Sequence, residues 1–396
     1  GTAGMNVTSA LSTGLDLRTQ RAVQLMQRFA EHTLGERSWS EAEDAPKRSE
    51  PHRYLWTDAF AVCNFLSLAH ATGEARWLDL ARRVVSAVHV TLGRHRADDW
   101  REGWLSGLSE RGAIAHPTWG GLRIGKPLPE RKWDDALDER LEWERDGQYF
   151  HYLTRWMHAL DQLARFTHQP RYNLWARELA AVAFAAFSVP SGHGGPKRLV
   201  WKMSIDLTRP LVASTGHHDA LDGLITCVQL QSTAAALHST AEGPSLQEER
   251  TGFEAMAEGS AWATTDPLGL GSLLCDAYRV AQLQAEGAKL DDELFATLLS
   301  AALDGLAHYA HQNALARPAA SRLAFRELGL AVGLHALERL SRGAPPRFRL
   351  TREAARLLEA LGPAVTLGSE VDAFWLKPEH REASSWAEHR ELNEVT

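Results

Sequence analysis

The sequence is poor in cysteine. Cys63, Cys227 and Cys275 are the three cysteines among its 396 residues, and each falls within an apolar stretch with helical spacing. A free thiol in such a stretch behaves as a small buried hydrophobe, so we expect no disulfide framework. The shortage of cysteine suits a reducing compartment, and the sequence therefore predicts a cytoplasmic protein.

Segments that would carry the chain into a membrane are also missing from the printed sequence. The longest apolar stretch covers residues 179–187, far short of the about 20 residues that span a bilayer. No basic and then apolar signal segment opens the chain. Residues 1–4 precede Met5, and we interpret them as a remnant of an expression tag. We expect no membrane partner and a single domain over residues 5–396.

Charge of one sign is not concentrated anywhere in the sequence. The 43 lysines and arginines against 50 acidic residues give a net charge of -7, and no segment forms a basic stripe, so we expect no nucleic-acid partner. A glycine-rich phosphate loop and a Gly-x-Ser-x-Gly elbow are both absent from the sequence. These absences argue against nucleotide-dependent and serine-hydrolase chemistry, and we expect no cofactor.

Tryptophan is abundant, with 14 copies against 6 tyrosines and 5 methionines. Ten of the tryptophans fall in predicted connections or at their edges: Trp39, Trp56, Trp100, Trp104, Trp119, Trp133, Trp143, Trp201, Trp262 and Trp375. An indole has a flat apolar face and one hydrogen-bond donor, which suits the apolar face of a sugar ring. The alternative is that these tryptophans anchor long loops to the core.

Apolar periodicity and capping residues predict an all-α protein with six pairs of helices. The expected helices cover residues 15–33, 58–71, 74–92, 146–167, 170–187, 217–238, 245–257, 267–285, 291–311, 320–340, 351–361 and 384–393. The helix over residues 146–167 has Asp146 as its expected N-cap and is apolar on more than one side. Its first turns carry Gln148, Tyr149 and His151. A buried helix with a polar and aromatic start indicates the wall of a pocket.

The connections between the expected helices are unequal in length. Short turns follow the helices over residues 58–71 and 146–167. Long segments precede the helices that begin near residues 58, 146, 217 and 384; they cover residues 34–57, 93–145, 188–216 and 362–383. In a ring of antiparallel hairpins every second connection lies at the same end, so we expect the long loops to share one face and to form a site there. Residues 96–130 are expected to hold a small β-hairpin, and residues 198–205 a strand.

Three short stretches carry a resemblance to a known superfamily. Residues 53–60, Arg-Tyr-Leu-Trp-Thr-Asp-Ala-Phe, open an inner helix, and the hairpin turns read Thr-Gly-Glu-Ala-Arg-Trp-Leu at 72–78 and His-Gln-Pro-Arg-Tyr-Asn-Leu at 168–174. Together with the alternating helical hairpins, they resemble the six-hairpin glycosidase superfamily. The resemblance implies an (α/α)6 barrel with a sugar site in a funnel at one end, and small β-hairpins among the loops of that face. The superfamily also contains sugar epimerases and isomerases.

Glycoside hydrolysis commonly uses two carboxyl groups on segments that meet at the site. Asp58, Asp146, Asp219 and Asp266 each lie at the start of an expected inner helix, although an aspartate there is also a common N-cap. Asp146 and Asp219 have the most polar and aromatic surroundings. We therefore predict this pair as acid and base, without ordering the two roles.

Several side chains beside these carboxyl groups are predicted to bind the sugar. They are Trp56, Asp58, Trp143, Gln148, Tyr149, Lys202, Arg209, His217, His218, Trp375 and Glu382. His217, His218 and Asp219 would also suit a metal ion, but no third ligand at a recognised spacing accompanies the two histidines. We expect no metal.

The leading hypothesis is a glycoside hydrolase that cleaves a small oligosaccharide or glycoside. The first alternative is a sugar epimerase or isomerase on the same barrel, with histidine as acid and base. The second alternative is a non-catalytic protein that binds carbohydrate or acts as a scaffold.

Overall fold

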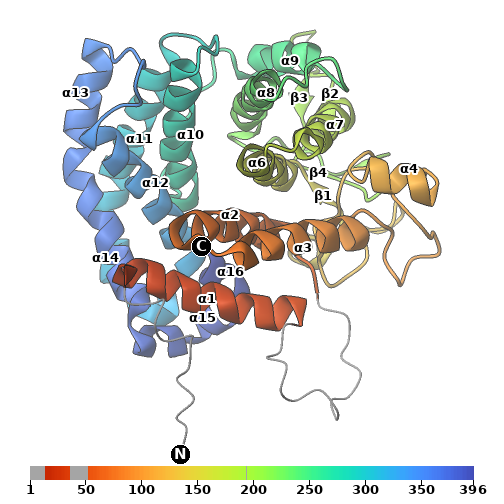
Figure 1. Ribbon diagram of the computed structural model, residues 1–396, viewed down its shortest axis with the longest axis horizontal. Helices are drawn as coiled ribbons and strands as arrows, with labels where there is room; N and C mark the ends of the chain where they lie inside the picture. Colours follow the sequence, from red (N-terminus) through yellow and green to blue (C-terminus); the bar gives the residue numbers. More distant parts are fainter. Residues whose placement is uncertain (1–13, 36–51, 193) are drawn as a thin grey trace, which may run out of the picture.

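The computed structural model describes residues 14–35, 52–192 and 194–396 and is mostly helical, with two small antiparallel sheets (Figure 1). The all-α class expected from the sequence is confirmed. Trp39, the expected tag remnant and most of the predicted connection 34–57 lie outside the described residues. The α-helices are α1 (Leu17–Leu34), α2 (Leu55–Thr72), α3 (Ala75–Leu92), α4 (Glu110–Ala115), α5 (Glu139–Glu144), α6 (Phe150–Thr167), α7 (Pro170–Phe187), α8 (Asp219–Ala236), α9 (Gln247–Ala257), α10 (Pro267–Ala285), α11 (Leu294–His311), α12 (Ala324–Arg342), α13 (Arg352–Leu361), α14 (Val365–Leu376), α15 (Ser384–Ala387) and α16 (Arg390–Val395).

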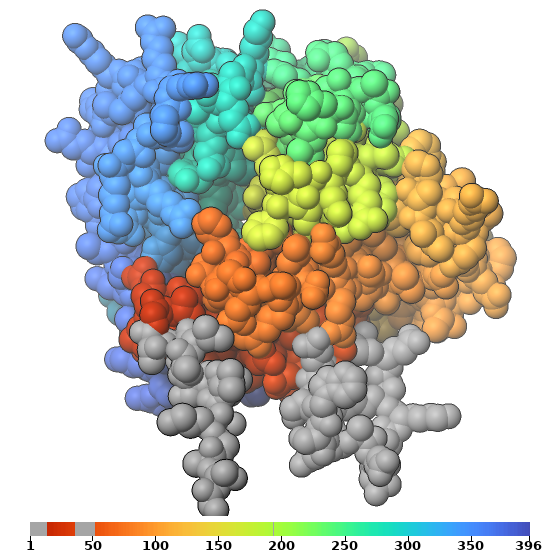
Figure 2. Space-filling model, in the orientation of Figure 1, coloured from red at the N-terminus to blue at the C-terminus, as the bar shows by residue number. Residues whose placement is uncertain are grey.

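The long helices pack in a continuous series. α2 contacts α6, α6 contacts α8, α8 contacts α10 and α10 contacts α12, while the short α16 contacts both α12 and α2. Each helix of this series also carries a neighbour from the same part of the chain: α1 and α3 on α2, α7 on α6, α9 on α8, α11 on α10, and α13 and α14 on α12. Figure 2 shows the orange surface of α2 and α3 between the red surface of α1 and the yellow-green surface of α6 and α7.

The turns within two of these pairs follow from their sequence. Gly73 ends α2 in the left-handed conformation with φ 70°, and its amide donates to the carbonyl of Ala69. His168 has the same role after α6 with φ 54°, and Pro170 then opens α7 at a position where a missing amide proton costs little. Both turns are as short as the sequence predicts.

Two of the expected helix starts are wrong and two are confirmed. Asp58 lies inside the first turn of α2, which begins at Leu55, and Asp146 lies four residues before α6. By contrast, Asp266 caps α10 by accepting from the amide of Gly269, and Thr351 caps α13 by accepting from the amide of Ala354.

α10 and α12 approach each other closely because small residues face one another. A Cβ added at Gly271 would lie 2.1 Å from the carbonyl oxygen of Gly329, and one added at Gly333 would lie 2.6 Å from the carbonyl oxygen of Gly271. Only glycine fits at this crossing.

The strands lie in the connections beside α6 and α7. β1 (Gln148–Tyr149) pairs with β4 (Lys202–Met203), which pairs with β5 (Pro210–Val212). β2 (Ser188–Val189) pairs with β3 (Arg198–Leu199). The strand predicted over residues 198–205 is therefore divided between two sheets. The expected hairpin in residues 96–130 is wrong, because that described segment holds α4 and no strand, and its isolated bridges join Trp104 to Arg94 and Leu128 to Arg145, both outside the segment.

The C-terminal part differs most from the sequence prediction. The connection expected over residues 362–383 contains α14, and the helix expected over residues 384–393 is divided into α15 and α16. Val371 and Trp375 are buried in a small apolar cluster with Trp386, separate from the main core. Because these side chains are four residues apart, they form an apolar face that stabilises α14.

No helix among the described residues has both the length and the apolar character to cross a bilayer.

Candidate functional site

A cavity of about 970 Å³ lies where the N-terminal turns of the packed series of helices meet. Its wall includes residues from the starts of α2, α6, α8, α10, α12 and α16 and from the connections that precede them. We call this space the central cavity. Its volume is within the range of about 300–1,000 Å³ that is common for small-molecule sites.

Aromatic side chains form one side of the central cavity. Trp201 stacks on His151 with ring centroids 6.1 Å apart and an interplanar angle of 9°, and Trp56 packs against His151 at 5.6 Å. The hydroxyl groups of Tyr54 and Tyr152 lie 2.6 Å apart and share a hydrogen bond. All five side chains line the cavity. This wall combines flat apolar faces with hydroxyl and ring N–H groups, as a sugar-binding surface requires.

Burial and one hydrogen bond determine the charge and the tautomer of His151. Burial lowers its pKa to about 3, so the imidazole is neutral near pH 7. The indole N–H of Trp201 lies 3.3 Å from Nδ1 of His151, and because an indole N–H can only donate, Nδ1 accepts. The remaining proton is therefore on Nε2, which makes His151 a hydrogen-bond donor.

His217 and His218 form a second polar group at the start of α8. Their rings stack with centroids 4.5 Å apart. Nε2 of His217 donates to the carbonyl of Ala261 at 2.6 Å, and Nε2 of His218 donates to the carbonyl of Trp262 at 2.9 Å. Burial lowers the pKa of His218. In the neutral state both rings keep Nδ1 as an acceptor.

Asp219 is the first residue of α8 and lines the central cavity. Its side chain is buried, and Oδ2 has no hydrogen-bond partner among the described residues. Burial raises the pKa of this carboxyl to about 7. The carboxyl group lies against Gly216, where an added Cβ would be 2.4 Å from Oδ2. The turn before α8 therefore positions a carboxyl group that is protonated in part of the molecules at neutral pH, unlike an ordinary aspartate.

Asp222 follows one helical turn later on the same wall. Its pKa is raised well above the ordinary value because the side chain is buried and because Asp276 lies beside it. Asp276 in turn accepts from the guanidinium of Arg279 at 3.2 Å. Burial and the neighbouring Asp276 therefore both favour the protonated form of Asp222.

The cations of the central cavity include Lys126, whose Nζ lies 4.2 Å from the ring centroid of Trp143. Burial lowers the pKa of Lys126 to about 8, while the nearby Glu144 acts in the opposite direction. Arg155 and Arg326 also line the wall. Arg326 pairs with Asp266 at 2.8 Å.

Five of the residues predicted from the sequence line the central cavity: Trp56, Trp143, His217, His218 and Asp219. The structure brings these together from α2, the end of α5 and the start of α8. The other predicted residues lie behind the wall or elsewhere.

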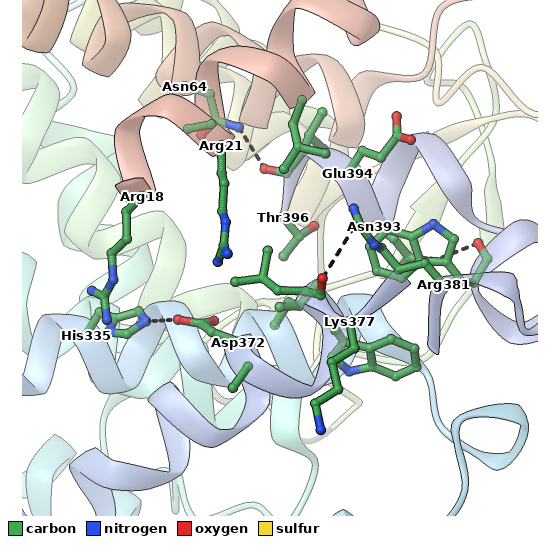
Figure 3. A pocket seen from close by; sticks show the side chains of 18 of the residues that line it. Arg18, Arg21, Asn64, His335, Asp372, Lys377, Arg381, Asn393, Glu394 and Thr396 are labelled. Carbon is green, nitrogen blue, oxygen red and sulfur yellow. Dashed lines mark hydrogen bonds and ion pairs between the residues drawn. The ribbon is translucent and has the colours of Figure 1, made fainter. Parts of the chain in front are cut away.

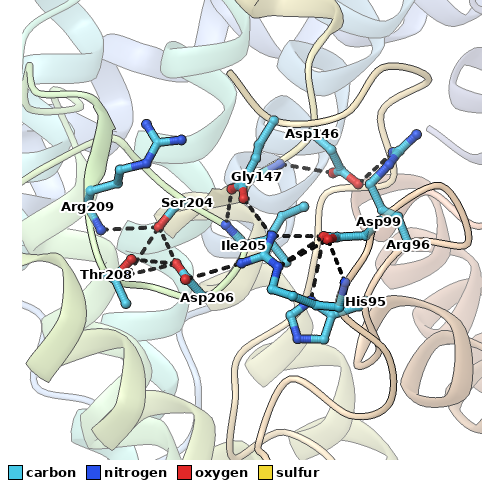
Figure 4. A network of polar contacts seen from close by, with 12 residues as sticks. His95, Arg96, Asp99, Asp146, Gly147, Ser204, Ile205, Asp206, Thr208 and Arg209 are labelled. Atoms are coloured by element: carbon cyan, nitrogen blue, oxygen red, sulfur yellow. Dashed lines mark hydrogen bonds and ion pairs between the residues drawn. The ribbon is translucent and has the colours of Figure 1, made fainter. Parts of the chain in front are cut away.

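Asp146 is fully buried beneath the loops and does not line the cavity (Figure 4). Its carboxylate pairs with Arg123 at 2.8 Å and with Arg96 at 3.0 Å, and it accepts from the amides of Gly125 and Gly147. Such a carboxylate has no free oxygen to offer a substrate. The geometry assigns Asp146 a structural role in holding these loops together.

Asp58 also lies outside the cavity wall. It is buried 3.5 Å from Arg53, and burial raises the pKa of its carboxyl to about 7. Its place inside α2 gives it contact with the core rather than with the cavity.

Gln148, Tyr149 and Lys202 form a layer behind the wall. Gln148 donates to the carbonyls of Gly120 and Ile205, Tyr149 stacks on Trp201 at 5.1 Å, and Lys202 pairs with Glu142 at 3.1 Å. All three are buried. They support the loops and the aromatic wall, and none of them lines the cavity.

Arg209 lies in the polar network shown in Figure 4, where its amide donates to Ser204. Its guanidinium donates to the carbonyl of Arg131. Arg209 therefore holds two loops together and does not line the cavity.

Trp375 and Glu382 lie away from the central cavity. Trp375 lines a second cavity of about 840 Å³ between α1, α2, α12 and α14 (Figure 3), and its indole donates to Glu327. Glu382 ends a short 3₁₀ turn and lines neither cavity. The chain that reaches the central cavity from the C-terminal region is residues 387–392 instead.

The described loop tryptophans differ in their surroundings. Trp56, Trp143 and Trp201 line the central cavity, whereas Trp104 and Trp262 are buried and anchor their loops. Trp100 and Trp133 are 89% and 82% exposed and do neither.

Several cavity residues were not in the predicted site. They include Tyr54, Lys126, Glu144, His151, Tyr152, Arg155, Trp201, Asp222, Asp266 and Arg326. Residues three or four apart on a helix lie on the same face. Asp222 could therefore have been inferred from Asp219, three residues earlier, and Arg155 from His151, four residues earlier. The contribution of Lys126 depends on the path of a long loop and has no such signal.

Among the described residues, no group of three or more histidine, cysteine, aspartate or glutamate side chains is placed to hold a metal ion. A comparison with models of known protein families and a search of curated proteins found no match to this chain.

Proposed function

We propose that this chain is a carbohydrate-active enzyme, a glycoside hydrolase that acts on a small oligosaccharide or glycoside within an (α/α)6 barrel. The series of contacts from α2 through α6, α8, α10 and α12 to α16 and back to α2 supports the barrel arrangement. The placement of the central cavity at the starts of these helices supports a site at one end of it. The aromatic wall supports a sugar as the substrate.

Asp219 carries the proposal. A glycosidase needs a carboxylic acid that keeps its proton near neutral pH, so that it can protonate the leaving oxygen. Asp219 meets this need, because it is buried, its Oδ2 has no partner among the described residues, and its pKa is raised to about 7. We assign it the role of general acid.

Glu144 is our choice for the second carboxyl group. The base must be ionised and must come from another segment of the wall. Glu144 ends α5, lines the central cavity and lies near the ammonium group of Lys126. It replaces Asp146 in this role, because the Asp146 carboxylate is fully used by Arg96, Arg123 and the loop amides.

Asp219→Asn tests the assignment of the acid. We expect the turnover of a hydrolysed glycoside to fall at least about 100-fold, because the amide cannot donate the proton. The matched control is Asp79→Asn, which changes an exposed aspartate of α3 and should leave turnover unchanged. Full activity in Asp219→Asn would refute the assignment.

The pH dependence gives a second test. An acid is active while protonated, so kcat/KM should fall as the pH rises through about 7, the pKa of Asp219. Asp219→Asn should lose this alkaline limb in whatever activity remains. An unchanged limb in the variant would show that another group produces it.

A sugar epimerase or isomerase is the second proposal, and His217 and His218 favour it. Both rings lie at the cavity and keep Nδ1 as an acceptor that can remove a proton from a sugar carbon. Product analysis separates the two reactions, since hydrolysis releases a reducing sugar and isomerisation gives a sugar of unchanged mass. Binding without either product would favour a non-catalytic carbohydrate-binding protein.

A further inference from the structure

Arg155 occupies a central position in the cavity wall. It lies on the second turn of α6, and its charge acts on ionisable groups of four helices: Cys63 of α2, His151 of α6, Asp222 of α8 and Cys275 of α10. Arg155 therefore lies within electrostatic range of ionisable groups on all four helices. Arg155 also lines the central cavity.

The guanidinium of Arg155 has no hydrogen bond and no ion pair among the described residues. Its contact is with the ring of Trp56, whose centroid lies 5.4 Å from the guanidinium carbon. An arginine remains charged at every physiological pH and offers five donors. A partly buried cation of this kind is stabilised by an anion that can bind it through two parallel hydrogen bonds.

No carboxyl group among the described residues forms an ion pair with Arg155. The charge of Arg155 acts on Asp222, but burial and the neighbouring Asp276 raise the pKa of Asp222 well above its ordinary value and so disfavour its carboxylate form. Arg326, which also lines the cavity, is different because Asp266 already pairs with it. Arg155 is therefore an available cation within the cavity.

We propose that the central cavity takes a sugar that bears an anionic group, a carboxylate or a phosphate, and that Arg155 binds this group. The inference rests on the proposed carbohydrate function and adds the class of substrate. The guanidinium carbon lies 5.4 Å from the ring centroid of Trp56, a cation–π contact that leaves the N–H donors of Arg155 available to a ligand. The proposal makes Arg155 a specificity residue, separate from the acid Asp219.

The test compares sugars that differ only in charge. Binding of glucuronate and glucose, of galacturonate and galactose, and of glucose 6-phosphate is measured by saturation-transfer NMR titration of the purified full chain. We expect at least one anionic sugar to bind at least tenfold more tightly than its neutral counterpart. The uronates test a carboxylate, and glucose 6-phosphate tests a phosphate.

Variants then assign the preference to Arg155. Arg155→Gln should reduce the anionic preference to less than about twofold, while Arg155→Lys, which keeps the charge and loses the planar fork, should retain part of it. The matched control is Arg171→Gln on the exposed surface of α7, which should retain the full preference. If Arg155→Gln does not fold, the wild-type protein still tests whether anionic sugars are preferred. A smaller preference in Arg155→Lys then assigns that preference to Arg155.

The possible results separate this inference from the proposed function. Equal binding of neutral and anionic sugars would refute the anionic substrate and leave the carbohydrate function standing. A preference that survives in Arg155→Gln would refute the role of Arg155. Failure of every sugar to bind would refute both proposals.

Discussion

A single carboxylate organises the longest connection of the chain. Asp146 accepts from two arginine side chains and from several backbone amides, and it is fully buried. Arg96 also donates to the carbonyls of Lys126 and Pro127. Arg96 therefore connects the loop that carries Lys126 to the segment before α6, because it pairs with Asp146 and donates to the carbonyl of Lys126.

Asp146→Asn should destabilise the protein by about 3–5 kcal/mol, because it leaves Arg96 and Arg123 without their buried counter-charge. Urea unfolding of the variant and the wild type measures this change. Asp98→Asn is the control, since Asp98 pairs with the same Arg96 but is half exposed, and it should cost less than about 1 kcal/mol. Equal stability of the two variants would show that the buried network contributes little.

At the scale of elements, the turn before α8 determines where the proposed acid lies. Gly216→Ala places a Cβ 2.4 Å from Oδ2 of Asp219, so the carboxyl group must move. We expect turnover to fall about 100-fold, since a displacement near 1 Å has this effect on a reacting group. Gly195→Ala is the control, because its nearest neighbour lies 3.6 Å away. Normal turnover in Gly216→Ala would mean that Asp219 is not the acid or that its exact position is unimportant.

The crossing of α10 and α12 depends on glycine. Gly271→Ala would bring a Cβ to 2.1 Å from a backbone oxygen, and we expect a destabilisation of about 1–3 kcal/mol from the forced separation of the two helices. Thermal and urea unfolding measure the loss. Gly362→Ala has open space around its Cβ and should leave stability equal or slightly higher. If both variants behave alike, the two helices are free to move apart at this crossing.

Most helices could be predicted from the sequence because apolar spacing and capping residues are local signals. Asp266 and Thr351 show this, since each caps the helix that it was predicted to start. The helix α14 was missed because the packing of Val371 and Trp375 against Trp386 and α12 joins segments that are distant in sequence and leaves no local signal. Asp219 could be found from its polar neighbours. Asp146 has similar neighbours in sequence, and its two arginine partners come from a loop 23 and 50 residues earlier.

For the whole molecule, the last helix closes the series of packed helices. Val395 is buried in the main core, and its carbonyl accepts from Asn64 of α2 at 2.7 Å. α16 contacts α1, α2 and α12, so helices from the two halves of the sequence depend on it.

Val395→Asp should destabilise the protein by about 3 kcal/mol or more, because a charge would enter the core without a partner. Hydrogen exchange should increase in α1 and α2 as well as in α16. The control is Val332→Asp at a position that is 39% exposed on α12. An increase confined to α16 would show that this helix is an independent appendage.

The tryptophans of the cavity wall give the protein an optical reporter of its own. Trp56 and Trp201 border the cavity and pack against other rings, whereas Trp77 and Trp156 are fully buried in the core. An occupant that displaces water from the wall changes the surroundings of the first pair and leaves the second pair in a constant environment. Intrinsic fluorescence can therefore follow occupancy without a label, with the core indoles as the steady background and a Trp201→Phe variant to assign the signal.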